Sequence, residues 1–168
     1  MSIRALVIGI GNGLRRDDGA GLMAARRLQA GAARVSRRRH SAEPFRVLEH
    51  SGEGVGLIDC WEGADAVILL DAVRSGAPPG TIHRWDARLR PLPAKAFRGS
   101  SHALGLAEAI ELARALGRLP PYLVVYGIEG RDFEAGTALS PEVEAALGHC
   151  VARVLEEARG LGAAVRSS

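Results

Sequence analysis

The sequence has 168 residues, enough for a compact domain with an apolar core, and 47% of them are hydrophobic while only 4% are aromatic. The formal net charge is +3, and Lys95 is the only lysine, so the basic charge is almost entirely arginine. Basic residues are not interleaved with aromatic ones as in a nucleic-acid-binding surface, and no apolar run approaches the ~20 residues of a membrane span or resembles a secretory signal. We therefore expect a cytoplasmic monomer that binds neither nucleic acid nor membrane.

Short apolar runs alternate with amphipathic segments along the chain. In order, the pattern predicts a strand at 4–9, a helix at 17–29, a strand at 46–50, a short helix at 57–61, strands at 66–70 and 81–85, a helix at 103–117, a strand at 122–127 and a last helix at 140–159. This alternation predicts an α/β three-layer sandwich, with a mostly parallel twisted sheet of about five strands and helices on both faces. Residues 81–85 follow the preceding strand after only a turn, so we expect that strand to be antiparallel. We expect residues 1–168 to form a single domain.

Two features fit plain structural roles. The run Arg37-Arg38-Arg39, within an arginine-rich segment at 31–45, is interpreted as a solvated loop. Cys60 and Cys150 are far apart and lack C-x-x-C spacing, so we expect two reduced, buried thiols.

Three polar residues fall beyond the expected carboxyl ends of strands, where open α/β sheets bind ligands. Asp18 follows the first strand and its glycine turn, Asp71 follows the strand at 66–70, and His102 precedes the helix at 103–117. Two carboxylates and an imidazole suit zinc or nickel and leave coordination positions open. Each residue alone also fits a simpler role. Asp17 and Asp18 would complement a helix dipole, Asp71 would cap a turn, and His102 would lie on the surface.

The glycine loop at 9–14 does not match a dinucleotide-binding fingerprint, because Leu14 stands where the third glycine should be and the helix–strand packing glycine is therefore missing. Walker A, H-E-x-x-H and G-x-S-x-G motifs are absent from the sequence. Ser100 and Ser101 adjoin His102, but adjacency in sequence is not the geometry of a catalytic triad.

Several motifs together resemble the nickel–iron hydrogenase maturation endopeptidases. They are Gly9-Ile10-Gly11-Asn12 with Asp17-Asp18-Gly19, the LLDAV sequence around Asp71, SSHALGL around His102, LVVYGIEG, and the helix start at Ser140-Pro141. The resemblance covers roughly residues 4–155. It implies an endopeptidase that removes the C-terminal peptide from the hydrogenase large-subunit precursor after nickel insertion. It also implies that Asp18, Asp71 and His102 are the catalytic and metal-binding residues and grip nickel presented by the precursor.

The sequence departs from the family pattern at three places. The loop HSGEGVG replaces a Gly-Gly-Thr type sequence, Asp18 stands where relatives have Glu, and the segment 31–45 has no counterpart. Two alternatives stay open. One is a nickel-binding hydrogenase assembly factor without protease activity. The other is a peptidyl-tRNA-hydrolase-like esterase, although that class has proline after the asparagine, where this chain has Gly13.

Overall fold

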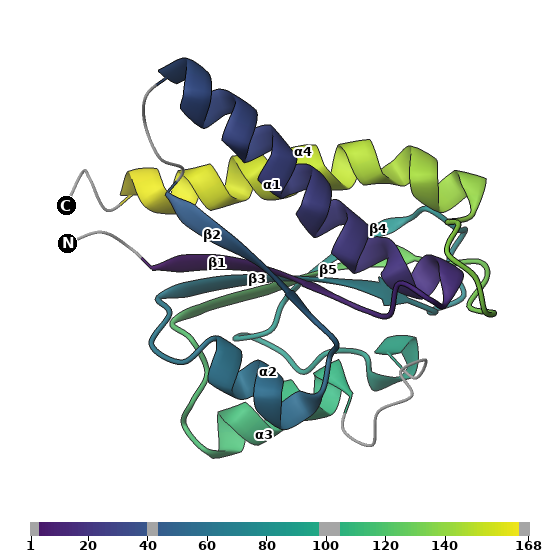
Figure 1. Cartoon of the computed structure of the whole chain (residues 1–168). Helices are drawn as coiled ribbons and strands as arrows, with labels where there is room; N and C mark the ends of the chain where they lie inside the picture. The colour runs from purple at the N-terminus through teal and green to yellow at the C-terminus, as the bar shows by residue number, and fades with distance from the viewer. Residues whose placement is uncertain (1–3, 40–43, 98–104, 165–168) are drawn as a thin grey trace.

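The computed structural model describes residues 4–39, 44–97 and 105–164. The elements in chain order are β1 (Ala5–Ile10), the 3-10 helix η1 (Arg16–Gly19), α1 (Ala20–Arg39), β2 (Phe45–His50), α2 (Gly54–Cys60), β3 (Ala66–Val73), β4 (Ile82–Asp86), the 3-10 helix η2 (Ala94–Phe97), α3 (Leu106–Ala115), β5 (Tyr122–Glu129) and α4 (Pro141–Ala164) (Figure 1).

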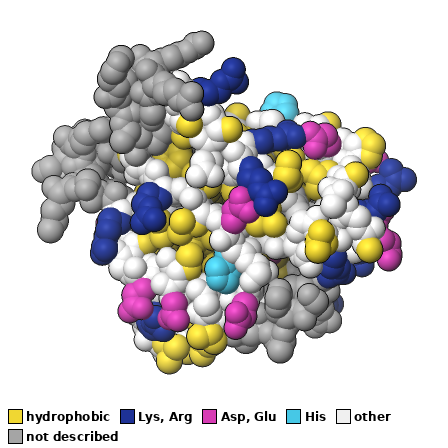
Figure 2. Space-filling view, in the orientation of Figure 1, with side chains coloured by type: hydrophobic (Ala, Val, Ile, Leu, Met, Phe, Trp, Pro, Cys, Tyr) yellow, Lys and Arg dark blue, Asp and Glu magenta, His cyan; other side chains and the backbone are white. Residues whose placement is uncertain are grey.

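The five strands form one sheet in the order β2-β1-β3-β5-β4. Neighbouring strands are parallel except β4, which is antiparallel to β5. Helices α1 and α4 cover one face and α2 and α3 the other, while the β2 edge faces the viewer in Figures 1 and 2. The predicted α/β sandwich and its antiparallel strand are confirmed.

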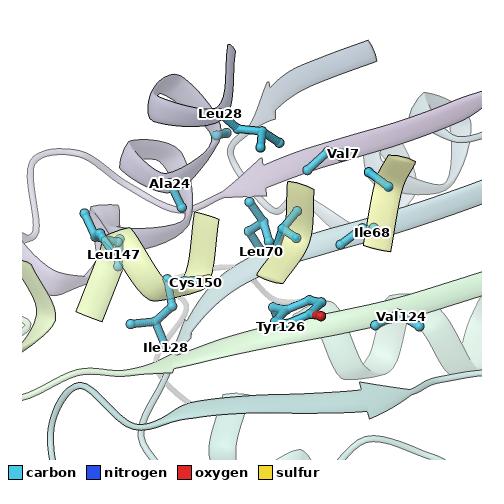
Figure 3. Packing of buried hydrophobic residues seen from close by; sticks show 14 of the residues in the cluster. Val7, Ala24, Leu28, Ile68, Leu70, Val124, Tyr126, Ile128, Leu147 and Cys150 are labelled. Carbon is cyan, nitrogen blue, oxygen red and sulfur yellow. The ribbon is translucent and has the colours of Figure 1, made fainter. Parts of the chain in front are cut away.

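Side-chain alternation along the strands fills a separate core on each face of the sheet. Ile68 and Val124 point into the core under α1 and α4, part of which is shown in Figure 3. Leu69 and Val125 point into the core under α2 and α3. Because both faces of the central strands are covered, these strands are continuous apolar runs, as parallel strands usually are.

Several elements extend beyond the ends that their sequence pattern predicts. Strand β3 continues through Asp71 to Val73, because Asp71 pairs with Gly127 and Val73 with Glu129 of β5. Helix α1 continues to Arg39, so the Arg37-Arg38-Arg39 run belongs to a helix and its interpretation as a loop was wrong. Helix α4 likewise continues beyond the predicted end, to Ala164. None of the described helices combines the length and apolar composition needed to span a membrane.

Candidate active site

Two glycines bring the start of α1 directly onto the carboxyl ends of β1 and β3. A Cβ on Gly21 would lie 2.3 Å from the carbonyl oxygen of Leu70 and 2.4 Å from that of Ile10. A Cβ on Gly9 would lie 2.5 Å from the Cβ of Ala25. Real Cβ atoms do not approach other atoms so closely, so this packing requires glycine. Gly21 thus supplies the helix–strand packing glycine that the dinucleotide fingerprint has at the position of Leu14.

The glycine turn after β1 holds Asp18. Gly11 has a φ of +148°, and a Cβ on it would lie 1.9 Å from the backbone oxygen of Asp18. The backbone N–H of Asn12 donates to the Asp18 carboxylate at 3.1 Å. The Asp18 side chain is only partly exposed. The G-x-G-N turn therefore fixes the position of this carboxylate at the carboxyl end of β1.

Asp71 and Asp18 are close enough to interact electrostatically. Asp71 is partly exposed in β3, and loss of solvent around its carboxyl group raises its pKa well above the usual value. The negative charge of Asp18 raises this pKa further, against a lowering backbone hydrogen bond from Ala72. A bound cation would offset both effects, and carboxylates are suitable ligands for it. The structure thus brings two of the three predicted ligands together.

His102, the third predicted ligand, lies outside the described residues. Within residues 4–39, 44–97 and 105–164, no group of three or more His, Cys, Asp or Glu side chains is arranged to hold a metal ion. The metal site formed by Asp18, Asp71 and His102 therefore stays a prediction.

Asp17, expected to complement a helix dipole, is instead a fully buried hydrogen-bond acceptor. Its carboxylate accepts hydrogen bonds from the backbone N–H groups of Arg131 (2.8 Å), Asp132 (2.9 Å) and Ser140 (2.7 Å) and from the Ser140 hydroxyl (2.7 Å). Burial alone would raise the pKa of Asp17, but these hydrogen bonds outweigh it and lower the pKa. Asp17 thereby ties η1 to the loop after β5 and to the start of α4.

A second contact between the same loop and η1 involves a strained residue. Arg16 has a φ of 41°, which non-glycine residues rarely adopt. Its N–H donates to the carbonyl of Gly136 at 2.9 Å, and its guanidinium lies 3.4 Å from the Asp132 carboxylate. These contacts hold the backbone conformation immediately before Asp18.

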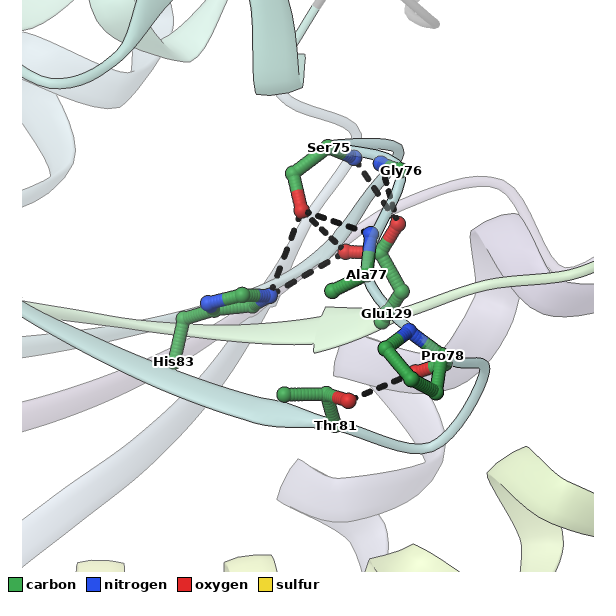
Figure 4. A network of polar contacts seen from close by, with 7 residues as sticks. All are labelled: Ser75, Gly76, Ala77, Pro78, Thr81, His83 and Glu129. Carbon is green, nitrogen blue, oxygen red and sulfur yellow. Dashed lines mark hydrogen bonds and ion pairs between the residues drawn. The ribbon is translucent and has the colours of Figure 1, made fainter.

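A buried glutamate, which the sequence pattern did not single out, organises the turn that follows β3. The Glu129 carboxylate accepts hydrogen bonds from the N–H groups of Ser75 (2.8 Å) and Gly76 (3.0 Å) and from the Ser75 hydroxyl (2.7 Å) (Figure 4). The Nε2 atom of His83 lies 3.1 Å from the same carboxylate, and its ring stacks on Trp85. In β5, Glu129 lies two residues beyond Gly127, the partner of Asp71. The network therefore holds the turn after β3 in place beside the candidate site.

Comparisons with known proteins identify the family. The family model described as hydrogenase maturation protease matches residues 32–157. The chain belongs to this family. It is 30% identical over 164 residues to the hydrogenase expression/formation protein HupD of Thiocapsa roseopersicina, covering 96% of this chain and 70% of that protein. It is 28% identical over 162 residues to the hydrogenase 2 maturation protease of Escherichia coli, covering 95% of this chain and 93% of that protein.

Solved structures agree with this assignment. The hydrogenase maturating endopeptidase HybD from Escherichia coli superimposes with a TM-score of 0.76 and 25% identity, covering 95% of this chain and 94% of that chain. The [NiFe] hydrogenase maturation protease HybD from Thermococcus kodakarensis gives a TM-score of 0.69 and 25% identity, covering 93% and 99%. As a hydrogenase maturation protease, the chain is an endopeptidase and hence a hydrolase.

Proposed function

We propose that this protease removes the C-terminal peptide from the large-subunit precursor of a nickel–iron hydrogenase, in the cytoplasm and as a monomer. In this proposal it recognises nickel already inserted into the precursor. Asp18, Asp71 and His102 bind that nickel and thereby place the scissile peptide bond beside the site. In this proposal the nickel belongs to the substrate, and the protease contributes only the three side chains that bind it.

One observation carries the proposal. Asp18 and Asp71 stand together at the carboxyl ends of β1 and β3, where the charge of Asp18 disfavours ionisation of Asp71. Two carboxylates in such a position are stabilised by a cation, and three protein ligands leave further positions for the ligands of the precursor. The family assignment supplies the reaction, because members are proteases of hydrogenase maturation.

The test compares nickel-loaded with nickel-free precursor. Each is incubated with the purified protease, and the products are weighed by mass spectrometry. We expect only the nickel-loaded precursor to lose a C-terminal peptide, and free zinc not to restore cleavage of the nickel-free form. Equal cleavage of both forms would show that recognition depends on the polypeptide alone. Binding of the nickel-loaded precursor without any mass loss would instead indicate an assembly factor.

A matched pair of variants compares the proposed ligand Asp71 with an exposed carboxylate that the proposal does not involve. Asp71→Asn removes a charge from the candidate site, and Glu134→Gln removes one from an exposed residue of the loop after β5. We expect processing to be nearly abolished in the first variant and unchanged in the second. Normal processing by Asp71→Asn would refute the role of this carboxylate.

A further inference from the structure

A histidine at the end of β2 lies on the same face of the sheet as Asp71. Leu48 packs against the core under α2 and α3, and His50 follows it by two residues, so alternation places His50 on that face. Leu69 belongs to the same core, and Asp71 follows it by two residues in β3. The imidazole and the Asp71 carboxylate therefore both lie on the side that α2 and α3 cover (Figure 1).

Only one strand, β1, separates these two residues across the sheet. Ile10 of β1 pairs with His50 of β2. The preceding residue of β1 pairs with Leu70, which precedes Asp71 in β3. His50 and Asp71 are thus at one level and two strand spacings apart, which is about 10 Å between their Cα atoms. The two side chains and one peptide group between them fill a gap of this size.

The turn after β2 determines which nitrogen of the His50 ring carries the proton. The backbone N–H of Gly52 donates to Nδ1 of His50 at 3.0 Å. Gly52 has a φ of +92°, a conformation that favours glycine. An Nδ1 atom that accepts a hydrogen bond is unprotonated, so the neutral imidazole has its proton on Nε2. The turn thus makes Nε2 a hydrogen-bond donor.

The first turn of α2 leaves space beside this donor. A Cβ on Gly56 would lie 3.3 Å from Nε2 of His50 and 3.7 Å from its Cε1. The Glu53 carboxylate is on the same side, with its Oε2 atom 3.8 Å from that Cβ position. His50 and Gly56 are both partly exposed. Because residue 56 has no side chain, an oxygen atom of a bound peptide has room to approach Nε2.

Hydrolysis of a peptide bond requires a group of this kind. The carbonyl oxygen becomes negatively charged as water adds, and a positioned hydrogen-bond donor stabilises that charge. Asp18 and Asp71 are only acceptors when ionised, so neither donates to this oxygen. A second histidine, His83, has its Nε2 atom 3.1 Å from the Glu129 carboxylate and is committed to that contact. The position and tautomer of His50 match the donor that the reaction needs.

We propose that His50 is a further catalytic residue, whose Nε2–H donates a hydrogen bond to the carbonyl oxygen of the scissile peptide bond. Water adds to the carbonyl carbon, and the electron pair of the C=O bond moves onto this oxygen. The C–N bond then breaks as the C=O bond re-forms. One proton of the attacking water goes to the departing amine, and the new carboxyl group releases the other to solvent. His50 keeps its own proton throughout. This inference rests on the proposed function, because it assigns a residue to the reaction proposed there.

Single-turnover cleavage of the nickel-loaded precursor tests the donor. Phenylalanine keeps a ring without an N–H, so we expect His50→Phe to lower the maximal rate by about a hundredfold or more. The side-chain amide of glutamine places an N–H near the position of Nε2, so His50→Gln should stay within about tenfold of wild type. The protease concentration that gives half the maximal rate should change by less than about twofold in both variants. His149→Phe, which replaces an exposed histidine of α4, is the matched control and should leave the rate unchanged.

A second variant changes the space beside the histidine and leaves the histidine itself in place. Gly56→Ala puts a methyl group next to Nε2, so it should slow the wild-type enzyme by about tenfold. The same change should not slow His50→Phe further, because that variant has no donor to displace. Alanine is more favourable than glycine inside a helix, so Gly56→Ala keeps the fold. Equal slowing in both backgrounds would contradict the inference.

Nitrogen chemical shifts of the imidazole, measured by NMR, test the tautomer without any precursor. At pH 8, where histidine is ordinarily neutral, we expect His50 to have a protonated Nε2 and an unprotonated Nδ1. The opposite tautomer, a normal rate in His50→Phe, or a His50→Gln variant as slow as His50→Phe would overturn the inference. A wild-type protease that leaves the nickel-loaded precursor uncut would instead refute the proposed function.

Discussion

Replacing Asp17 by alanine removes the acceptor of four hydrogen bonds and leaves three partly buried backbone N–H groups without that acceptor. These are the N–H groups of Arg131, Asp132 and Ser140. Each unsatisfied buried group costs about 1–3 kcal/mol, and some relaxation of the loop after β5 will admit water. We therefore expect Asp17→Ala to lower the free energy of unfolding by about 3–5 kcal/mol, and Asp17→Asn by less, because the amide keeps one acceptor oxygen.

Urea unfolding at pH 7 measures this loss, with Glu134→Ala, an exposed carboxylate in the same loop, as the control. The lowered pKa of Asp17 means that its carboxylate favours the folded state. That contribution is fully present above the unfolded-state pKa of about 3.9 and is lost as the pH falls toward the folded-state pKa. The difference between wild type and Asp17→Asn should thus shrink below about pH 4. A loss in Asp17→Ala no larger than in Glu134→Ala would refute the reasoning.

Three further predictions concern other parts of the molecule. Asp71→Ala and His102→Ala should each lower precursor processing by about a hundredfold or more. The double variant should be scarcely worse, because ligands of one site act as a unit. Additive losses in single-turnover assays would show that the two residues have separate roles. Cys150→Ala should keep full activity and cost about 1 kcal/mol of stability, since the thiol is buried and burial raises its pKa to about 12, which keeps it protonated. Glu157→Gln should cost about 1 kcal/mol in urea unfolding, because it breaks the ion pair with the partly exposed Arg84. The pKa of Glu157 is lowered, so this cost should shrink below about pH 4, and a cost independent of pH would contradict the ion-pair explanation.

Much of the fold was predictable from local sequence because its signals act between near neighbours. The apolar run at 66–70 is a strand with both faces covered, and Ser140-Pro141 stands at the start of α4 as predicted. The antiparallel direction of β4 followed from the short turn before it. The placing of Asp18 and Asp71 at adjoining strand ends followed from the parallel topology, since parallel strands end at the same edge of a sheet.

Element ends and buried polar groups depended on partners distant in sequence. Strand β3 continues past Asp71 because β5 offers backbone partners as far as Glu129, and no local pattern encodes that pairing. The burial of Asp17 likewise depends on a distant partner, because Ser140 is 123 residues away in the sequence. Local sequence could therefore assign Asp17 only a role at a helix start.

Local sequence patterns were enough to predict the order of strands and helices, the family resemblance and the two carboxylates beyond the ends of parallel strands. The role of His102 stays a prediction. Which of the two adjacent aspartates is buried depends on contacts made in the folded chain. In the folded chain, the Asp17 carboxylate accepts hydrogen bonds from N–H groups of the loop after β5, while Asp18 is partly exposed and its charge raises the pKa of Asp71. Burial and hydrogen bonding are properties of the surroundings of a side chain, so two neighbouring residues of the same type can have opposite surroundings.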